Sequence, residues 1–272
     1  AESGSSVVMT DLMNSSEARE AFWHEGYMFV QGYLSVSTAT LAARYALMQY
    51  RNQPRPEEDK DRPAQVPGAH SVYADPLAES ILDLATGDVS ELVGRHLVPS
   101  YAFYRVYRAG DTLKPHTDRV SCEISASLCL GHHLDDELPW PLGLRTNDEA
   151  PVNIELEQAP GDLILYRGSD CIHWRRRMRG GPDAWQAQLF LHWVDADGPY
   201  ANVCAFDTRP ALGLSENHRD PQRVARMQSI QTAVDNEKSI RLRSEYLALG
   251  VDLAASFDVA DSCGEDSFDA PT

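Results

Sequence analysis

The middle of the chain, from Tyr101 to Asp195, is a succession of short apolar or alternating segments separated by Gly, Pro and Asp. Segments of this length and spacing are typical of β-strands in an all-β unit built from two sheets. The expected strands are 101–108, 113–119, 123–131, 140–146, 152–158, 161–168, 171–178 and 185–195. The pattern therefore predicts a mainly β protein whose core is a jelly roll.

Helical patterns flank this core on both sides. We expect the first 99 residues to be a helical flank, interrupted by a Pro-rich and charged segment, 53–76, which reads as a long, lid-like loop. The pair Asp220-Pro221 favours the start of a helix that covers 220–249. The acidic tail 252–272 is expected to be disordered. Without an internal repeat or a clear boundary, the prediction is one domain over 1–272, with its β-core at 100–197.

Charge and composition limit the partners of the protein. The net charge is −17 and the pI is near 4.8, which disfavours nucleic acid and anionic membrane surfaces as partners. The sequence has no apolar run long enough to cross a bilayer. Its five cysteines are scattered, and the N-terminus does not read as a secretory signal, so a cytoplasmic location is expected.

Three His-x-Asp pairs could contribute to a metal site. His116 and Asp118 lie in an expected strand, where residues two apart point to the same side. The pair at 133 and 135 lies in a polar connection, and Asp220 of the third pair is expected to cap a helix. We therefore interpret only the first pair as metal ligands.

A third ligand is available on another expected strand. His173 follows the turn Pro160-Gly161-Asp162 and an apolar segment, and it lies on the seventh strand, which neighbours the second strand in a jelly roll. Two imidazoles and one carboxylate hold one face of an octahedral ion and leave three positions open. A closed structural zinc site would need a fourth ligand, and no cysteine has suitable spacing.

With these residues, the core from about Ser100 to Asp197 resembles the Fe(II)- and 2-oxoglutarate-dependent oxygenases, whose fold is a cupin-like double-stranded β-helix. The segment PGDLILYRG before His173 is similar to the prolyl-hydroxylase-like branch, and FWHEGYMFVQGYL is similar to the opening of such enzymes. The resemblance implies that His116, Asp118 and His173 bind iron, with 2-oxoglutarate and O2 as cosubstrates. The carboxylate of Asp118 favours hydroxylation over halogenation, and desaturation or ring formation stay open.

The far carboxylate of 2-oxoglutarate requires charge-assisted donors if it is buried. Many relatives supply a cation some ten residues after the second histidine, but this sequence has none there. Strand alternation from His173 offers Arg175 first and Arg177 second. Further candidates are hydroxyl groups on neighbouring strands, at Tyr104 and Tyr166, and a cation on the fourth strand, Arg145.

The substrate is less constrained by the sequence. We expect a small polar molecule, such as an amino acid, held by Arg119 and walled by Trp140. A peptide or protein substrate is the alternative within the same chemistry. A zinc hydrolase and a non-catalytic ligand-binding jelly roll are the alternatives outside it.

Overall fold

The computed structural model describes residues 16–52, 65–66, 69–135, 139–146 and 152–248. The chain divides into two compact units, Ala1–Met227 and Gln228–Thr272. The first unit holds both sheets and the candidate site. The second begins inside the long C-terminal helix, and its described part continues that helix. The expectation of a single domain stays a prediction.

Three helices precede or interrupt the early strands. They are α2 (Ser16–Glu25), α3 (Val36–Asn52) and α4 (Pro76–Val93). The start of α4 is fixed by Asp75, whose carboxylate accepts hydrogen bonds from the backbone N–H groups of Leu77 and Ala78 at 3.0 and 3.2 Å. Its end is fixed by Gly94, which adopts the left-handed conformation at φ 67°.

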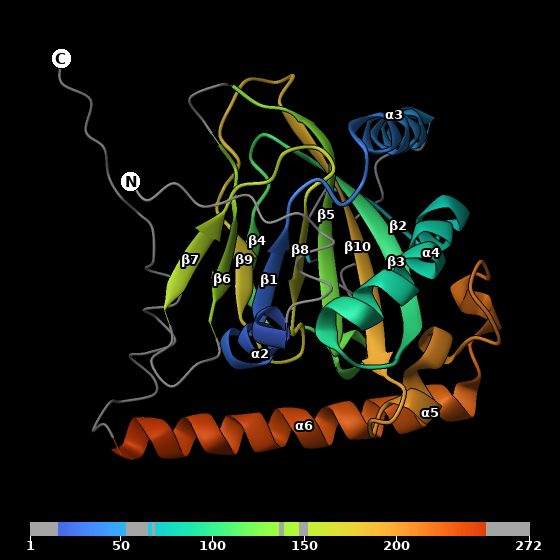
Figure 1. Cartoon of the computed structure of the whole chain (residues 1–272), viewed down its shortest axis with the longest axis vertical. Helices are drawn as coiled ribbons and strands as arrows, with labels where there is room; N and C mark the ends of the chain where they lie inside the picture. Colours follow the sequence, from blue (N-terminus) through green and yellow to red (C-terminus); the bar gives the residue numbers. More distant parts are fainter. Residues whose placement is uncertain (1–15, 53–64, 67–68, 136–138, 147–151, 249–272) are drawn as a thin grey trace. The chain divides into compact units, whose positions relative to one another are not determined.

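The larger sheet has six strands in the order β1-β8-β5-β10-β3-β2, and the paired strands are antiparallel (Figure 1). Its strands are β1 (Tyr27–Val30), β2 (His70–Tyr73), β3 (Leu97–Arg108), β5 (Ile124–His133), β8 (Leu163–Tyr166) and β10 (Trp185–Asp195). Strand β2 lies inside the segment 53–76 that was predicted to be loop. The stretches 53–64 and 67–68 of that segment lie outside the described residues, and so does the tail 252–272.

The smaller sheet has four antiparallel strands in the order β4-β9-β6-β7. They are β4 (Leu113–His116), β6 (Leu142–Arg145), β7 (Asn153–Leu156) and β9 (His173–Arg175). Each of the eight predicted core strands is therefore present, and several are shorter than predicted. The double-stranded β-helix places β4 and β9, the second and seventh strands of the core, side by side.

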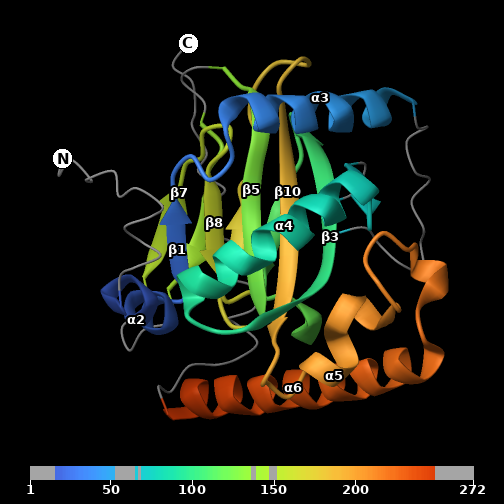
Figure 2. The same ribbon diagram turned by 45° about the vertical axis from the view of Figure 1, so that its right-hand side comes forward.

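The larger sheet separates two apolar regions. On its outer face lie helices α3 and α4, which Figure 2 shows in front of β5, β10 and β3. Residues of one parity along the strands, such as Ala102, Leu128 and Leu189, are buried against these helices. Residues of the other parity point between the two sheets, because side chains alternate along a strand. The interior between the sheets contains the candidate site.

The segment after β10 contains three short helical turns and then a long helix. They are α5 (Ala201–Cys204), η2 (Ala205–Thr208), η3 (Glu216–His218) and α6 (Pro221–Ala248). As predicted, Asp220 caps α6, since its carboxylate accepts from the N–H groups of Gln222 and Arg223 at 2.8 and 3.3 Å. Across the described residues, no helix combines the length and apolar character that a membrane span requires.

Candidate metal centre and its cavity

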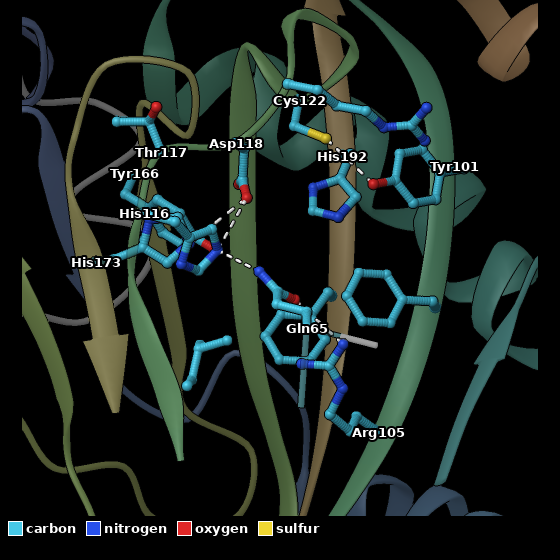
Figure 3. Close-up of a pocket in the computed structure, with 14 residues that line it drawn as sticks. Gln65, Tyr101, Arg105, His116, Thr117, Asp118, Cys122, Tyr166, His173 and His192 are labelled. Carbon is cyan, nitrogen blue, oxygen red and sulfur yellow. Dashed lines mark hydrogen bonds and ion pairs between the residues drawn. The ribbon is translucent and has the colours of Figure 1, made fainter. Parts of the chain in front are cut away.

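The three predicted metal ligands converge on one point between the sheets. His116 ends β4 and His173 begins β9, and the two are directly paired across these antiparallel strands. Asp118 follows two residues after His116. Its Oδ1 atom lies 3.6 Å from Nε2 of His116 and 3.5 Å from Nε2 of His173. The three ligand atoms all lie within 4.8 Å of one another, a spacing at which one ion can contact all three (Figure 3).

Backbone hydrogen bonds fix the orientation of both imidazoles. Nδ1 of His116 lies 2.8 Å from the carbonyl oxygen of Lys114, and Nδ1 of His173 lies 3.1 Å from that of Cys171. A carbonyl oxygen only accepts, so each Nδ1 carries the proton and each Nε2 keeps its lone pair. Both rings therefore present a metal-binding nitrogen to the side of Asp118, supported from behind as in known metal sites.

The carboxylate of Asp118 is positioned by Ser125 and Gly168. Its Oδ2 atom accepts from the hydroxyl of Ser125 at 2.8 Å, and its backbone N–H donates to the carbonyl of Gly168 at 2.8 Å. A Cβ atom at position 168 would lie 2.1 Å from Ser125 Oγ and 2.6 Å from Asp118 Oδ2, so only glycine allows this approach. Ser125 orients Asp118 so that Oδ1 faces the histidines.

The pKa shifts in this group agree with a cation site. Burial raises the pKa of Asp118, but the nearby His173, together with His116 and His192, outweighs burial and holds that pKa below its ordinary value. Burial lowers the pKa of His173. The carboxylate is thus ionised and the His173 imidazole is neutral near pH 7, which are the forms that bind metal.

A cavity of about 270 Å³ opens in front of the three ligands. Its described lining comes from both sheets, from the segment between β4 and β5, and from Gln65 ahead of β2. The residues are Gln65, Tyr101, Phe103, Arg105, Leu113, His116, Thr117, Asp118, Arg119, Cys122, Tyr166, His173, Phe190 and His192. Such a volume is at the small end for ligand pockets, which favours a small molecule as occupant. Asp118 is the only carboxylate in the described lining.

Two of the predicted cosubstrate residues lie beside the metal ligands. The ring of Tyr166 packs against His173 with 4.7 Å between centroids, and Tyr166 lines the cavity. Arg175 points inward two residues after His173 and is 1% exposed. Its guanidinium donates to the carbonyl of Trp140 at 2.8 Å and to Oε1 of Gln158 at 3.1 Å, while its Nε–H meets no acceptor among the described residues.

Three other residues predicted to bind the cosubstrate do not line the described cavity. Tyr104 lies on the opposite parity of β3 and packs under α3, where its ring meets Tyr45 at 6.2 Å. Arg177 is exposed because β9 ends at Arg175, so strand alternation does not reach it. Arg145 is also exposed, at the end of β6.

The two predicted substrate residues have different surroundings. Trp140 does not line the cavity, because it is buried behind Arg175, whose guanidinium lies 4.9 Å from the centre of its ring. Arg119 does line the cavity, and its guanidinium covers the ring of Tyr101 at 4.5 Å. The same guanidinium donates to Oδ2 of buried Asp207 at 2.9 Å, so its charge is already balanced.

Asp207 also binds a second arginine and lies in unusual backbone. Its Oδ2 atom accepts from Arg219 and from the hydroxyl of Tyr73. Burial raises the pKa of Asp207, but Arg119 and Arg219 outweigh burial and keep it below its ordinary value. The stretch 206–208 adopts left-handed conformation at three consecutive non-glycine residues, with φ of 51°, 52° and 70°.

Sequence reasoning missed Arg105, which lines the cavity from β3. Its side chain is 7% exposed and shares the inward parity of Tyr101, Phe103 and Tyr107. Both parities of this strand contain aromatic residues, so the sequence pattern alone did not identify the inward one. The feature that could have identified the cavity-facing side is the arginine itself, because a charged residue is unusual in the middle of a buried strand.

Neither a protein-family model nor a curated protein matches the sequence. Solved structures do match. A prolyl-4-hydroxylase from Pseudomonas putida is 14% identical with a TM-score of 0.52, over 66% of this chain and 98% of that one. The non-haem α-ketoglutarate-dependent epimerase SnoN is 13% identical with a TM-score of 0.54, over 66% and 82%. The α-ketoglutarate-dependent carbocyclase SnoK is 14% identical with a TM-score of 0.54, over 71% and 88%.

The chain has the fold of the α-ketoglutarate-dependent oxygenases. The double-stranded β-helix predicted from the sequence is confirmed, and so is the resemblance in fold to this group. α-Ketoglutarate is another name for 2-oxoglutarate. Within this fold, His116 and His173 lie on the adjoining strands β4 and β9 that the sequence indicated, and Asp118 lies in the loop after β4, past the observed end of the predicted strand 113–119.

Proposed function

We propose that the protein is an Fe(II)- and 2-oxoglutarate-dependent dioxygenase that hydroxylates an unactivated C–H bond of a small molecule. The observation that carries the proposal is the donor set, in which His116, His173 and Asp118 aim two neutral nitrogens and one carboxylate oxygen at a common point beside a cavity. This set fits a non-haem iron ion and leaves coordination positions for cosubstrates. The similarity in fold to α-ketoglutarate-dependent enzymes supports the same reading.

When bound, iron and 2-oxoglutarate supply the oxidising chemistry: O2 places one oxygen atom in succinate, CO2 is released, and the other oxygen atom enters the substrate C–H bond. The protein's own contribution is positioning. Ser125 and the two backbone carbonyls behind the histidines hold the ligand atoms, and the walls of the cavity place the substrate and exclude water.

Arg175 is the residue that we propose to bind the far carboxylate of 2-oxoglutarate. Its buried guanidinium has no carboxylate partner within the described part of the chain, and its pKa is lowered by burial. A buried cation of this kind is costly unless it is paired with an anion. Two strand residues span about 7 Å, a length comparable with the carbon chain of 2-oxoglutarate. Leu113, the cross-strand partner of Arg175, lines the cavity, so the arginine lies next to its wall.

Spectroscopy of the anaerobic complex tests the proposal. Fe(II) and 2-oxoglutarate added without O2 should give the visible metal-to-ligand charge-transfer band of this cosubstrate on iron. The band should be absent in His116→Ala and in His173→Ala. His133→Ala is the matched control, because His133 is an exposed histidine at the end of β5 and should leave the band unchanged.

Turnover of 2-oxoglutarate to succinate in air is the second measurement. A wild-type chain that binds Zn(II) tightly, shows no band and forms no succinate would refute the proposal and favour a hydrolase. Binding of small molecules that does not change in the His116→Ala variant would favour a non-catalytic jelly roll.

A further inference from the structure

We infer that the substrate is a carboxylic acid with an apolar body and no ammonium group, and that Arg105 binds its carboxylate. The inference rests on the proposed function and goes further by naming the substrate class. It begins from the charges in the cavity. Arg105 and Arg119 are the two guanidinium groups in the described lining, and only Arg119 has a carboxylate partner.

The partners of Arg105 are all neutral. Its Nε–H donates to Oγ of Ser71 at 2.7 Å, and its terminal nitrogens donate to the hydroxyl of Tyr107 and to Oε1 of Gln65, each at 3.2 Å. The side chain is almost fully buried, so its charge is poorly solvated. In a chain of net charge −17, a buried arginine left without a carboxylate among the described residues marks a place for an anionic ligand group.

Gln65 shows how close this place is to the metal ligands. Its amide nitrogen lies 2.5 Å from Nε2 of His116, and its amide oxygen accepts from Arg105 (Figure 3). One amide group therefore spans the interval between the histidine and the guanidinium. The hydrogen bonds on either side of the amide are 2.5 and 3.2 Å long, so distance alone does not separate Arg105 from a cosubstrate role. We assign Arg105 to the substrate because Arg175 is the proposed partner of the far carboxylate of 2-oxoglutarate. A substrate carboxylate fits there, with its neighbouring carbon atoms toward the metal centre.

The aromatic wall of the cavity defines the rest of the ligand. The rings of Phe103 and Phe190 stack with 4.6 Å between centroids and 20° between planes, and Tyr101 continues the row at 6.2 Å and 16° from Phe103. All three residues line the cavity. The three rings make this side of the cavity apolar, which favours an apolar body in the ligand.

The described lining offers nothing to an ammonium group. Its one carboxylate, Asp118, is a proposed metal ligand, and Asp207 is 0% exposed and already holds two arginines. An amino acid would therefore place its positive charge beside Arg105 and Arg119 without a counter-ion. This distinguishes a simple acid from the amino acid expected from the sequence.

Calorimetry of the full chain loaded with Ni(II) and 2-oxoglutarate tests the inference without turnover. The probes are 3-phenylpropanoate, 3-phenylpropanamide and phenylalanine, which share a ring and differ in charge. We expect the acid to bind about tenfold or more tightly than either other probe, because only the acid gains charge-assisted hydrogen bonds without adding a cation. Equal affinity for acid and amide, or tighter binding of phenylalanine, overturns the inference.

Two arginine variants assign the effect to a residue. In Arg105→Gln the affinity for the acid should fall to that for the amide, while the affinity for the amide stays the same. Arg179→Gln removes an exposed arginine outside the cavity and should change neither. An acid preference that survives Arg105→Gln overturns the assignment. If Arg105→Gln does not fold, the comparison of probes on the wild-type chain still decides the ligand class.

The iron band separates this inference from the proposed function. Anaerobic Fe(II) and 2-oxoglutarate should give the band in Arg105→Gln as in the wild type. Loss of the band in a folded Arg105→Gln variant would mean that Arg105 holds the cosubstrate, which refutes the inference and leaves the oxygenase proposal intact. Absence of the band in the wild type refutes the oxygenase proposal, whereas the acid preference is measured independently with Ni(II).

Discussion

Replacement of Gly168 by alanine should disturb the metal centre from a residue that is not itself a ligand. The added Cβ would lie 2.1 Å from Ser125 Oγ, 2.6 Å from Asp118 Oδ2 and 2.6 Å from the carbonyl oxygen of Cys122. Ser125 can avoid the methyl group only by rotating away from Asp118, and the carbonyl of Cys122 is backbone. The substitution therefore combines overpacking with loss of the hydrogen bond that orients Asp118.

The size of the effect follows from these two parts. Overpacking in a filled interior costs roughly 1–3 kcal/mol, and loss of a hydrogen bond to a charged group costs roughly 1.5–3 kcal/mol. We expect Gly168→Ala to lower the free energy of unfolding of the metal-free chain by about 2.5–6 kcal/mol. Since Asp118 loses its orienting partner, affinity for Ni(II) should also fall by about 10–100-fold.

Urea denaturation measures the first quantity, and calorimetric titration of the folded variant with Ni(II) measures the second. Gly87→Ala is the control, because Gly87 lies on the exposed side of α4 with no atom near its added Cβ, and alanine there should stabilise the helix by up to about 1 kcal/mol. Wild-type metal affinity in Gly168→Ala would refute the reasoning about Asp118, even if stability fell.

Three further predictions concern single side chains. Arg175→Gln should weaken 2-oxoglutarate binding about tenfold or more in the Ni(II)-loaded chain and leave Ni(II) affinity unchanged. Unchanged 2-oxoglutarate affinity would contradict the proposal that Arg175 binds its far carboxylate. Glu79→Ala leaves the buried guanidinium of Arg209 without its carboxylate and should lower the free energy of unfolding, measured in urea, by roughly 3–5 kcal/mol. Asp83→Ala is the control: Asp83 is exposed on the same helix, and its replacement should change stability little. Burial lowers the pKa of His70, so the unfolded chain takes up the proton first and stability falls as pH drops below about 6.5. His70→Phe should therefore lose less stability than the wild type between pH 7 and 5, and an identical pH profile would refute this.

The two histidines of the candidate metal centre could be brought together from the sequence because their positions depend on strand adjacency. His116 and His173 need only the neighbouring place of the second and seventh strands. Asp118 lies two residues past the end of β4, where the backbone of Gly168 and the hydroxyl of Ser125 hold it.

Strand parity, counted from His173, predicted that Arg175 faces inward, and its side chain is buried. This parity did not extend to Arg177, because the length of a three-residue strand is set by pairing with β4 and β6 rather than by local sequence.

The cavity residues were harder to predict for a different reason. In β3 both faces are buried, one under the helices and one between the sheets, so each parity carries aromatic side chains. Whether Tyr104 or Arg105 faces the cavity depends on which face of the sheet the helices cover, and local sequence does not determine this tertiary contact. Gly168 and Ser125 support Asp118 through contacts between segments that the sequence does not show to be close.

The left-handed stretch at 206–208 bears on how the preference of such a protein among acidic substrates could change. Each non-glycine residue in this conformation costs on the order of 1 kcal/mol, and together they hold Asp207 under Arg119. A substitution that let this bend relax would free a second guanidinium inside the cavity without altering any residue of its wall. Selection for a doubly charged acid could thus begin outside the pocket, in a turn that no ligand touches.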